Sequence, residues 1–351
     1  MEIEAEEQMI NREFAKPNIA KLKEMSLPHY KSKEFSEYLT ELTKRRFGLD
    51  IDVLKYLAKG GSSYIYETKI KSNEKSIVVK VINDEKYKNL NEPKLLSILK
   101  HKNVITVYGY YYAKNEEEFI VMEKGRDLKS FGMILLKRVT LTETFLCYIT
   151  VQILEGLSYL YKCNVIHYDI KPGNIIIDDY LNVKLIDFSA SLIISEKKDS
   201  YINAKYRGTQ FFMAPEVIKR EKIKVRDYHK IDLFSLGVTL YTLAFGFYPF
   251  NLEKNDGEND NIIYQKITSD WKAENIGTEF SGKFLDFLNC LLEKDINKRI
   301  DINNALNHYW IKGAKILFDE KEKINNANAF LTSLITDNFF PFNEYIYKYI
   351  K

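Results

Sequence analysis

The sequence predicts an α+β protein of two lobes, a small β-rich lobe followed by a larger helical lobe. From residue 51 to residue 122, runs rich in β-branched and aromatic residues alternate with short polar turns, as the strands of a sheet do. After Gly125, apolar residues instead recur at intervals of three and four, which is the spacing of amphipathic helices. We expect a hinge at residues 123–127, and a ligand site there, because ligands bind preferentially between lobes.

The composition is that of a soluble globular protein with a sizeable core. Of its 351 residues, 45% are hydrophobic and 29% are charged, and the net charge of +3 gives no argument for a nucleic-acid partner. The start, MEIEAEEQ, lacks the apolar segment of a secretory signal, and the most apolar run, 238–250, is too short to cross a bilayer. The three cysteines are widely spaced, odd in number and form no metal-type pairs, which favours a reducing compartment and hence an intracellular, cytoplasmic protein. The five histidines show no zinc-ligand spacing.

Residues 1–50 are expected to form an N-terminal extension. Phe35, Leu39 and Leu42 fall at helical spacing, which predicts one short amphipathic helix. We expect that helix to pack on its own domain, and the alternative is a contact with a partner.

The first lobe, residues 51–122, is expected to be a sheet with one short helix. Leu95, Leu96 and Leu99 mark the helix. Strands are predicted over residues 64–70, 76–82, 104–112 and 118–122.

The second lobe, residues 128–312, is expected to be mostly helical. The clearest helix covers residues 142–161, with Thr142 as its N-cap and Glu143 in its first turn. Three more helices are predicted over residues 231–245, 283–292 and 302–308. Residues 189–209 have few apolar anchors after Ile194 and are predicted to form a mobile loop. The aromatic tail, residues 313–351, is expected to pack on the second lobe, or else to bind a partner.

The stretch VIHYDIKPGNIIIDDYLNVKLIDFS, residues 165–189, places polar side chains between apolar runs. Buried charges are costly unless they are paired or bound to a metal. One interpretation is a surface hairpin with ordinary polar turns. The other is a pair of short strands that present carboxylates and an amide at one edge, where they can hold divalent metals and a hydroxyl group. The side chains concerned are His167, Asp169, Lys171, Asn174 and Asp187.

Two features of the first lobe are suited to phosphate binding. The glycine pair in LAKGGSSYIYE, residues 57–67, would let backbone N–H groups approach phosphate oxygens, although such a pair is usually only a hairpin turn. Lys80 ends the apolar strand IVVK and needs an anionic partner. Glu92, on the following short helix, is the first candidate.

Taken in order, these motifs resemble those of the eukaryotic protein kinases, over residues 51–310. The form DIKPGN and Thr209 in GTQFFMAPE resemble the serine/threonine branch. The resemblance implies an enzyme that uses ATP and Mg²⁺ and transfers the γ-phosphoryl group to a hydroxyl of a protein substrate.

The resemblance also implies roles for individual residues. Asp169 would be the catalytic base, Lys171 would offset charge on the transferred phosphoryl group, and Lys80 would be the strand-three lysine of the catalytic set. Asn174 and Asp187 would hold two Mg²⁺ ions. The expected nucleotide-binding residues are Leu57, Gly60, Gly61, Ser62, Ser63, Ile65, Val78, Lys80, Glu92, Glu123, Asp127, Asn174, Ile176 and Asp187.

Other residues that match the kinase pattern are expected to stabilise the fold around the site rather than to take part in the reaction. Asp232 resembles the buried anchor of the catalytic loop, and Arg299 would pair with Glu216. His167 is expected to be a packed residue rather than an acid or a base.

The chain departs from the family pattern in several places, among them the catalytic loop, residues 167–174, and the glycine loop within residues 57–67. Ala58 and Ser63 replace the outer glycines, and Val78 stands where alanine is usual. Tyr168 replaces the arginine that usually gathers an activation-loop phosphate, so we expect phosphorylation there not to be the principal on-switch. Ser189 replaces the glycine after Asp187 and Phe188, which should stiffen the metal-binding turn. This is a non-RD variant with HYD and DFS motifs.

A proline marks the start of the short helix in the first lobe. Pro93 fits only a first helical turn, so the helix is expected to begin near residue 91, with Glu92 at its end.

Two rival functions remain open from the sequence. The first is a pseudokinase scaffold that binds nucleotide or partners without phosphotransfer, as the altered glycine loop allows. The second is a nucleotide-gated interaction module that acts through the aromatic tail. The basic run over residues 219–230 would be a solvated loop, or a surface that favours acidic substrates.

Overall fold

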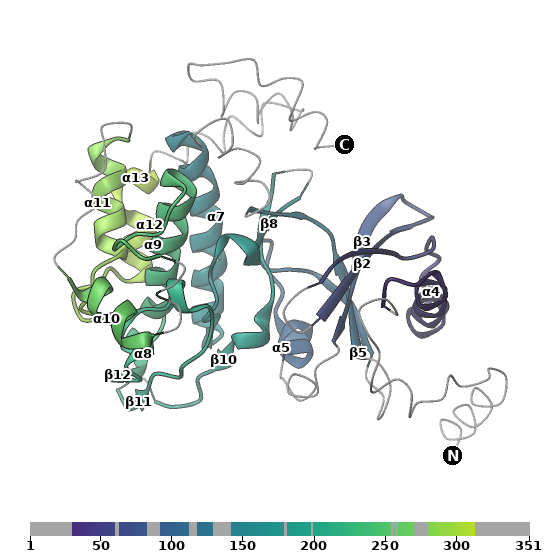
Figure 1. Cartoon of the computed structure of the whole chain (residues 1–351), viewed down its shortest axis with the longest axis horizontal. Helices are drawn as coiled ribbons and strands as arrows, with labels where there is room; N and C mark the ends of the chain where they lie inside the picture. The colour runs from purple at the N-terminus through teal and green to yellow at the C-terminus, as the bar shows by residue number, and fades with distance from the viewer. Residues whose placement is uncertain are drawn as a thin grey trace. The chain divides into compact units, whose positions relative to one another are not determined.

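The computed structural model describes most of the chain between residues 30 and 312 (Figure 1). The described residues are 30–59, 63–82, 92–111, 118–128, 142–178, 181–197, 199–253, 256, 259–269 and 280–312. They fall into two compact units, one made of residues up to 93 together with 106–124, the other of residues 94–105 and those from 125 onward. Gly60, Gly61, Ser62 and the aromatic tail lie outside the described residues.

The first unit contains a five-stranded antiparallel sheet in the order β1-β2-β3-β5-β4. Its strands are β1 (Lys55–Lys59), β2 (Ser63–Ile70), β3 (Lys75–Ile82), β4 (Val107–Tyr111) and β5 (Glu118–Glu123). The strands predicted from the sequence are present. The strand β4 begins later than predicted, because Val104 forms only an isolated bridge to Leu185.

One face of this sheet is covered by helix α4 (Lys33–Phe47), as Figure 1 shows. Tyr66, Val79 and Val121 are cross-strand neighbours, and all are fully buried in one cluster with Phe35 and Leu39 of the helix. A side-chain N-cap at Ser32 starts the helix, and Gly48 ends it in the left-handed conformation. The helix therefore packs on its own domain, as predicted.

The opposite face of the sheet carries the residues expected to bind a nucleotide. Because side chains alternate between faces along a strand, the cross-strand neighbours Ile65, Lys80 and Ile120 share this face. Val78 lies two residues before Lys80 on β3, so Val78 and its cross-strand neighbour Met122 lie on the same face. The sheet thus separates the face that packs on α4 from the face that carries these expected nucleotide-binding residues.

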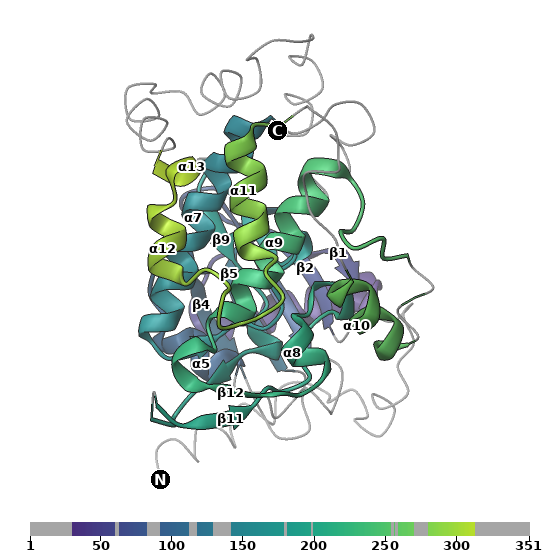
Figure 2. The ribbon, with the colours of Figure 1, turned by 90° about the vertical axis from the view of Figure 1, so that its left-hand side faces the viewer.

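The second unit is built on two long helices, α7 (Glu143–Lys162) and α9 (Lys230–Phe245). Helix α9 contacts both α7 and α11 (Gly282–Leu291), and α12 (Ile302–Asn307) packs on α7, as both ribbon views show (Figures 1 and 2). The four predicted helices all form, each within one residue of the expected ends, and the side chain of Thr142 caps α7. Shorter helices are α5 (Glu92–Ile98), α8 (Pro215–Ile218), α10 (Asp260–Thr268) and α13 (Tyr309–Lys312).

Short strands position the functional loops of this unit. A three-stranded sheet has the order β6-β8-β9, and two strand pairs, β7 with β10 and β11 with β12, lie outside it. These strands are β6 (Arg126–Asp127), β7 (Val165–Ile166), β8 (Ile175–Ile177), β9 (Val183–Leu185), β10 (Leu192–Ile193), β11 (Tyr201–Asn203) and β12 (Lys222–Lys224).

The loop predicted over residues 189–209 contains two short strands that were not predicted. Within this range β10 pairs with β7 and β11 pairs with β12, and Ala204, after Ile194, is also buried. These strands carry little signal in the sequence because each is only two or three residues long and its partner is distant in sequence. The basic run over residues 219–230 supplies one of those partners, β12, so it is not simply a solvated loop.

None of the helices in the described part of the chain is long and apolar enough to span a bilayer.

Candidate active site

The loop after β7 brings Asp169, Lys171 and Thr209 into one hydrogen-bonded group. The Nζ of Lys171 lies 2.7 Å from Oδ2 of Asp169 and 2.6 Å from Oγ1 of Thr209. The hydroxyl of Thr209 in turn donates to Oδ1 of Asp169 at 2.7 Å. Asp169 is buried, and Lys171 is partly exposed. Both carboxylate oxygens of Asp169 are therefore held in fixed directions, as a positioned acid or base requires.

Asn174 locks the far end of this loop. Its amide nitrogen donates to the backbone oxygen of Asp169 at 2.9 Å and to Oδ2 of the same residue at 2.7 Å. A 3-10 turn over Pro172–Asn174 brings the amide back toward Asp169. Because the amide nitrogen makes these bonds, the amide oxygen is the atom that Asn174 can offer to a cation.

The hairpin formed by β8 and β9 brings the backbone before Asp187 next to the backbone of Asn174. The backbone N–H of Ile186 donates to the carbonyl of Asn174 at 3.0 Å, so the residue that follows it, Asp187, leaves the hairpin beside Asn174. Asp187 has φ of 60°, in the left-handed region that aspartate tolerates better than most residues. The carboxylate and amide predicted to hold metal ions thus lie on adjoining segments of one unit.

Helix α9 anchors the catalytic loop through Asp232. The two carboxylate oxygens accept the backbone N–H groups of His167 and Tyr168, each at 2.8 Å. Burial raises the pKa of Asp232, and the interaction with His167 together with these two hydrogen bonds opposes that rise. The carboxylate fixes the loop in the way that was expected of it.

His167 is fully buried, and both of its ring nitrogens face backbone groups. Its Nε2 lies 3.0 Å from the oxygen of Ile186, and its Nδ1 accepts the N–H of Asp169 at 3.3 Å. The ring packs against Phe188, with 4.7 Å between the ring centroids. This environment matches the packed role predicted for His167.

Tyr168 links the catalytic loop to the segment that follows β10. Its hydroxyl donates to the hydroxyl of Tyr228 at 2.7 Å and accepts the backbone N–H of Lys205 at 3.2 Å. Tyr228 then donates to the carbonyl of Asn203 at 3.1 Å. Burial raises the pKa of Tyr168, so its phenol stays neutral and can donate at physiological pH.

A buried ion pair joins the end of that segment to the helical core. Arg299 contacts the two carboxylate oxygens of Glu216 at 2.7 and 3.0 Å, and the pair is almost fully excluded from solvent. Arg299 also donates to the carbonyls of Lys230 and Glu293. The predicted pairing is therefore confirmed, in the bidentate geometry that suits a buried arginine.

In the first unit, Lys80 and Glu92 form the predicted pair. The ammonium of Lys80 lies 3.1 Å from each carboxylate oxygen of Glu92, and both side chains are buried. Helix α5 begins at Glu92, directly before Pro93, as the proline requires.

The remaining predicted nucleotide-binding residues lie on strands or at their ends. Leu57 lies in the bulge of β1 and is exposed, whereas Ser63 is buried at the start of β2. Glu123 ends β5 and accepts the N–H of Thr106 at 2.6 Å. In the second unit, Asp127 and Ile176 are partners in the β6–β8 pair.

Sequence reasoning missed two residues of this site. Thr209 was used only to identify the kinase branch, yet its hydroxyl contacts both Asp169 and Lys171. Its place in GTQFFMAPE is the signal that could have found it. Tyr228 lies in the basic run and carries no motif of its own, so nothing in the sequence points to its contact with Tyr168.

Comparison with known proteins identifies the family of this chain. The protein kinase domain matches residues 51–311. The chain therefore belongs to the protein kinase family.

Its relatives include several proteins named as kinases. The chain is 28% identical to the probable serine/threonine-protein kinase fhkA of Dictyostelium discoideum, over 75% of this chain and 50% of that protein. It is 31% identical to the MAP kinase kinase MKK1/SSP32 of Saccharomyces cerevisiae, over 75% of this chain and 53% of the relative. It is 26% identical to serine/threonine-protein kinase D3 of Homo sapiens, over 76% of this chain and 29% of the relative. The chain thus spans about half or less of the length of these relatives.

Proposed function

We propose that the chain is an ATP-dependent serine/threonine protein kinase that transfers the γ-phosphoryl group of Mg-ATP to a protein hydroxyl. The observation that supports this most is the hydrogen-bonded group of Asp169, Lys171, Asn174 and Thr209. Charged side chains at these positions have no folding role that would keep them together, whereas phosphoryl transfer needs such a group.

In the proposed reaction, Asp169 orients the substrate hydroxyl and accepts its proton. The hydroxyl oxygen bonds to the γ-phosphorus as the bond from that phosphorus to the β–γ bridging oxygen breaks, and ADP leaves. The ammonium of Lys171, 2.7 Å from Asp169, lies where it can offset charge on the transferred phosphoryl group. Asn174 and Asp187 would hold Mg²⁺, which when bound supplies positive charge to the phosphates.

The residues proposed to contact the nucleotide are those that the kinase resemblance implies. Lys80, which Glu92 holds in place, would bind the phosphates, and backbone N–H groups of the glycine-rich segment, Gly60, Gly61, Ser62 and Ser63, would approach the phosphate oxygens. The remaining residues proposed to contact the nucleotide are Leu57, Ile65, Val78, Glu123, Asp127 and Ile176.

We further propose that this kinase is a non-RD variant that does not need activation-loop phosphorylation. In kinases with arginine before the catalytic aspartate, that arginine gathers a phosphate and so orders the segment. Here the hydroxyls of Tyr168 and Tyr228 bond the backbone of that segment at Lys205 and Asn203. Neutral hydrogen bonds would then do what an arginine–phosphate pair does elsewhere.

The test is phosphotransfer from Mg-ATP to a generic serine/threonine substrate, run with the wild-type chain and with Asp169→Asn. The variant should lose activity by roughly 10²–10⁴-fold, the usual contribution of a general base, and should still bind ATP. Asp199→Asn, which changes an exposed carboxylate in the activation segment, is the matched control and should keep its activity.

Two outcomes would contradict the proposal. Near-normal turnover of Asp169→Asn would remove Asp169 from the role of base. Binding of ATP without any transfer by the wild-type chain would favour the pseudokinase scaffold.

A further inference from the structure

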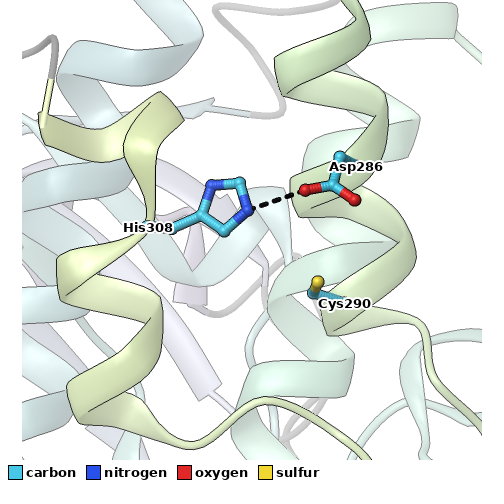
Figure 3. Close-up of side chains that lie close together, drawn as sticks. All are labelled: Asp286, Cys290 and His308. Atoms are coloured by element: carbon cyan, nitrogen blue, oxygen red, sulfur yellow. Dashed lines mark hydrogen bonds and ion pairs between the residues drawn. The ribbon is translucent and has the colours of Figure 1, made fainter.

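A second cluster of reactive side chains lies in the helical unit, on α11 and at the end of α12 (Figure 3). Asp286 and Cys290 are four residues apart on α11, so they project from the same side of the helix one turn apart. His308 follows α12 and directs its ring toward Asp286, with 3.1 Å between Nε2 and Oδ2. One ligand atom from each of the three residues lies within 4.8 Å of the others.

We propose that Asp286, Cys290 and His308 form a zinc site, with water as the fourth ligand. Thiolate sulfur, imidazole nitrogen and carboxylate oxygen are the three ligand types that Zn²⁺ takes in proteins, and this cluster supplies one of each. Three protein ligands and an open position are also a common zinc arrangement. The ligand atoms lie within 4.8 Å of one another, so they must move closer together to bond a central ion at about 2.0–2.3 Å.

The neighbours of the cluster hold two of these ligands in place. The ring of His308 lies between Phe287 and Tyr309, with centroid distances of 4.9 and 4.3 Å. The hydroxyl of Tyr309 donates to Oδ2 of Asp286 at 2.7 Å, which orients the carboxylate. A hydrogen bond to a metal-bound carboxylate from a second residue is the usual support of a metal site.

The charges around Cys290 favour a cation at this point. Asp286 and Glu293 both place negative charge near the sulfur of Cys290. A bound Zn²⁺ would offset that charge.

Binding has an identifiable cost at His308. Its Nδ1 accepts the backbone N–H of Trp310 at 3.3 Å, which places the ring proton on Nε2. For Nε2 to bind zinc, that proton must move to Nδ1, and the long bond to Trp310 is lost. The loss of this one long, neutral hydrogen bond is a small cost beside the binding of a zinc ion.

The consequence for the fold is a link between two helices. Zinc would join α11 to the residue that ends α12 and would therefore stabilise the helical unit in proportion to its occupancy. The site is independent of phosphotransfer, because none of its ligands contacts the residues of the candidate active site among the contacts of the described residues.

The test uses Co²⁺ as a spectroscopic substitute for Zn²⁺, added to the full-length reduced chain. Tetrahedral binding with one sulfur ligand gives an intense near-ultraviolet band from thiolate-to-cobalt charge transfer, at one ion per chain, and added Zn²⁺ should remove it. Cys290→Ser should abolish the band. Cys163→Ser is the matched control, because Cys163 is the exposed cysteine at the end of α7, and it should keep the band.

Two further variants test a ligand and its support. Tyr309→Phe removes the supporting hydrogen bond and should weaken zinc binding by about 10–100-fold, in competition with a chromogenic chelator. Asp286→Asn changes the ligand itself and should weaken zinc binding at least as much as Tyr309→Phe does. The thermal midpoint of unfolding should rise with Zn²⁺ in the wild-type chain and not in Cys290→Ser. The proposal is overturned if no cobalt band appears, if the band survives in Cys290→Ser, or if it disappears in Cys163→Ser. Cys147 is buried and its Sγ donates to the backbone oxygen of Trp310 at 3.3 Å, so it is not expected to bind the added ion.

Discussion

The catalytic loop, residues 167–174, and the activation segment, residues 187–216, are held in place by different kinds of contact. In the catalytic loop, Asn174 and Lys171 bond Asp169 from only a few residues away, and Asp232 adds two bonds from α9. The activation segment instead depends on distant partners: β11 pairs with β12, and Glu216 pairs with Arg299.

The difference shows which parts of the site tolerate change. Local hydrogen bonds form with little loss of chain entropy, whereas distant pairs must be supported by the rest of the fold. We therefore expect substitutions in the distant anchors to disturb the activation segment and the stability of the helical unit. Substitutions of Asp169, Lys171 and Asn174 in the catalytic loop should disturb mainly the chemistry, whereas Tyr168 belongs with the distant anchors because it bonds Tyr228 and Lys205.

The largest expected effect on stability is at the buried ion pair. Glu216→Gln leaves the buried guanidinium of Arg299 without a counter-charge, which should lower the free energy of unfolding by about 3–5 kcal/mol. Urea denaturation of the helical unit measures this. Lys102→Gln is the control, because its pair with Glu155 is exposed on the lysine side and should contribute about 1 kcal/mol or less. Equal effects of the two substitutions would show that burial of the pair does not matter.

Acid should weaken the same region through His229, which adjoins Tyr228. Burial lowers the pKa of His229 from 6.5 to about 4, and its Nε2 accepts the N–H of Ile302. Between pH 6.5 and about pH 4, the His229 ring takes up a proton in the unfolded chain but stays neutral in the folded chain. The stabilisation from the neutral ring is therefore complete above pH 6.5 and is lost as pH falls toward 4, to the extent of about 3 kcal/mol.

The measurement is the free energy of unfolding from pH 7 to pH 4, for the wild-type chain and for His229→Gln. The difference between the two curves isolates this residue from the other groups that titrate. Parallel curves would contradict the assignment.

A smaller effect is expected when one hydroxyl is removed from the activation-segment anchor. Tyr168→Phe loses the bonds to Tyr228 and to the N–H of Lys205, which should cost about 1 kcal/mol and increase hydrogen exchange at Lys205. Tyr201→Phe is the control, since the Tyr201 ring is exposed. If exchange at Lys205 is the same in both variants, Tyr168 does not anchor the segment.

The smallest effect is expected from removing phosphate. Treatment with a phosphatase should leave kinase activity within about twofold, because Tyr168 offers no cation to a phosphate on Ser195, Ser200 or Tyr201. Activity before and after treatment is compared on one substrate. Loss of most activity would mean that phosphorylation, rather than the tyrosine bonds, orders the segment.

Local patterns in the sequence predicted most of the fold. The spacing of apolar residues predicts the helices α7, α9, α11 and α12, and β-branched and aromatic residues predict the strands β2, β3, β4 and β5. The pairing of Lys80 with Glu92 is expected from the ordered motifs, and the contacts agree. Apolar residues recur every two residues in a strand and every three to four residues in a helix because each element buries one of its faces, so these periods predict the element from the sequence.

Only the tertiary structure could decide contacts between residues that share no local pattern. No sequence pattern joins Tyr168 to Tyr228 or Cys290 to His308, and the cysteines and histidines show no metal-ligand spacing along the chain. Those residues meet because helices and strands that are distant in the chain pack against one another. Spacing along a chain predicts a metal site only when the ligands come from one element or one motif.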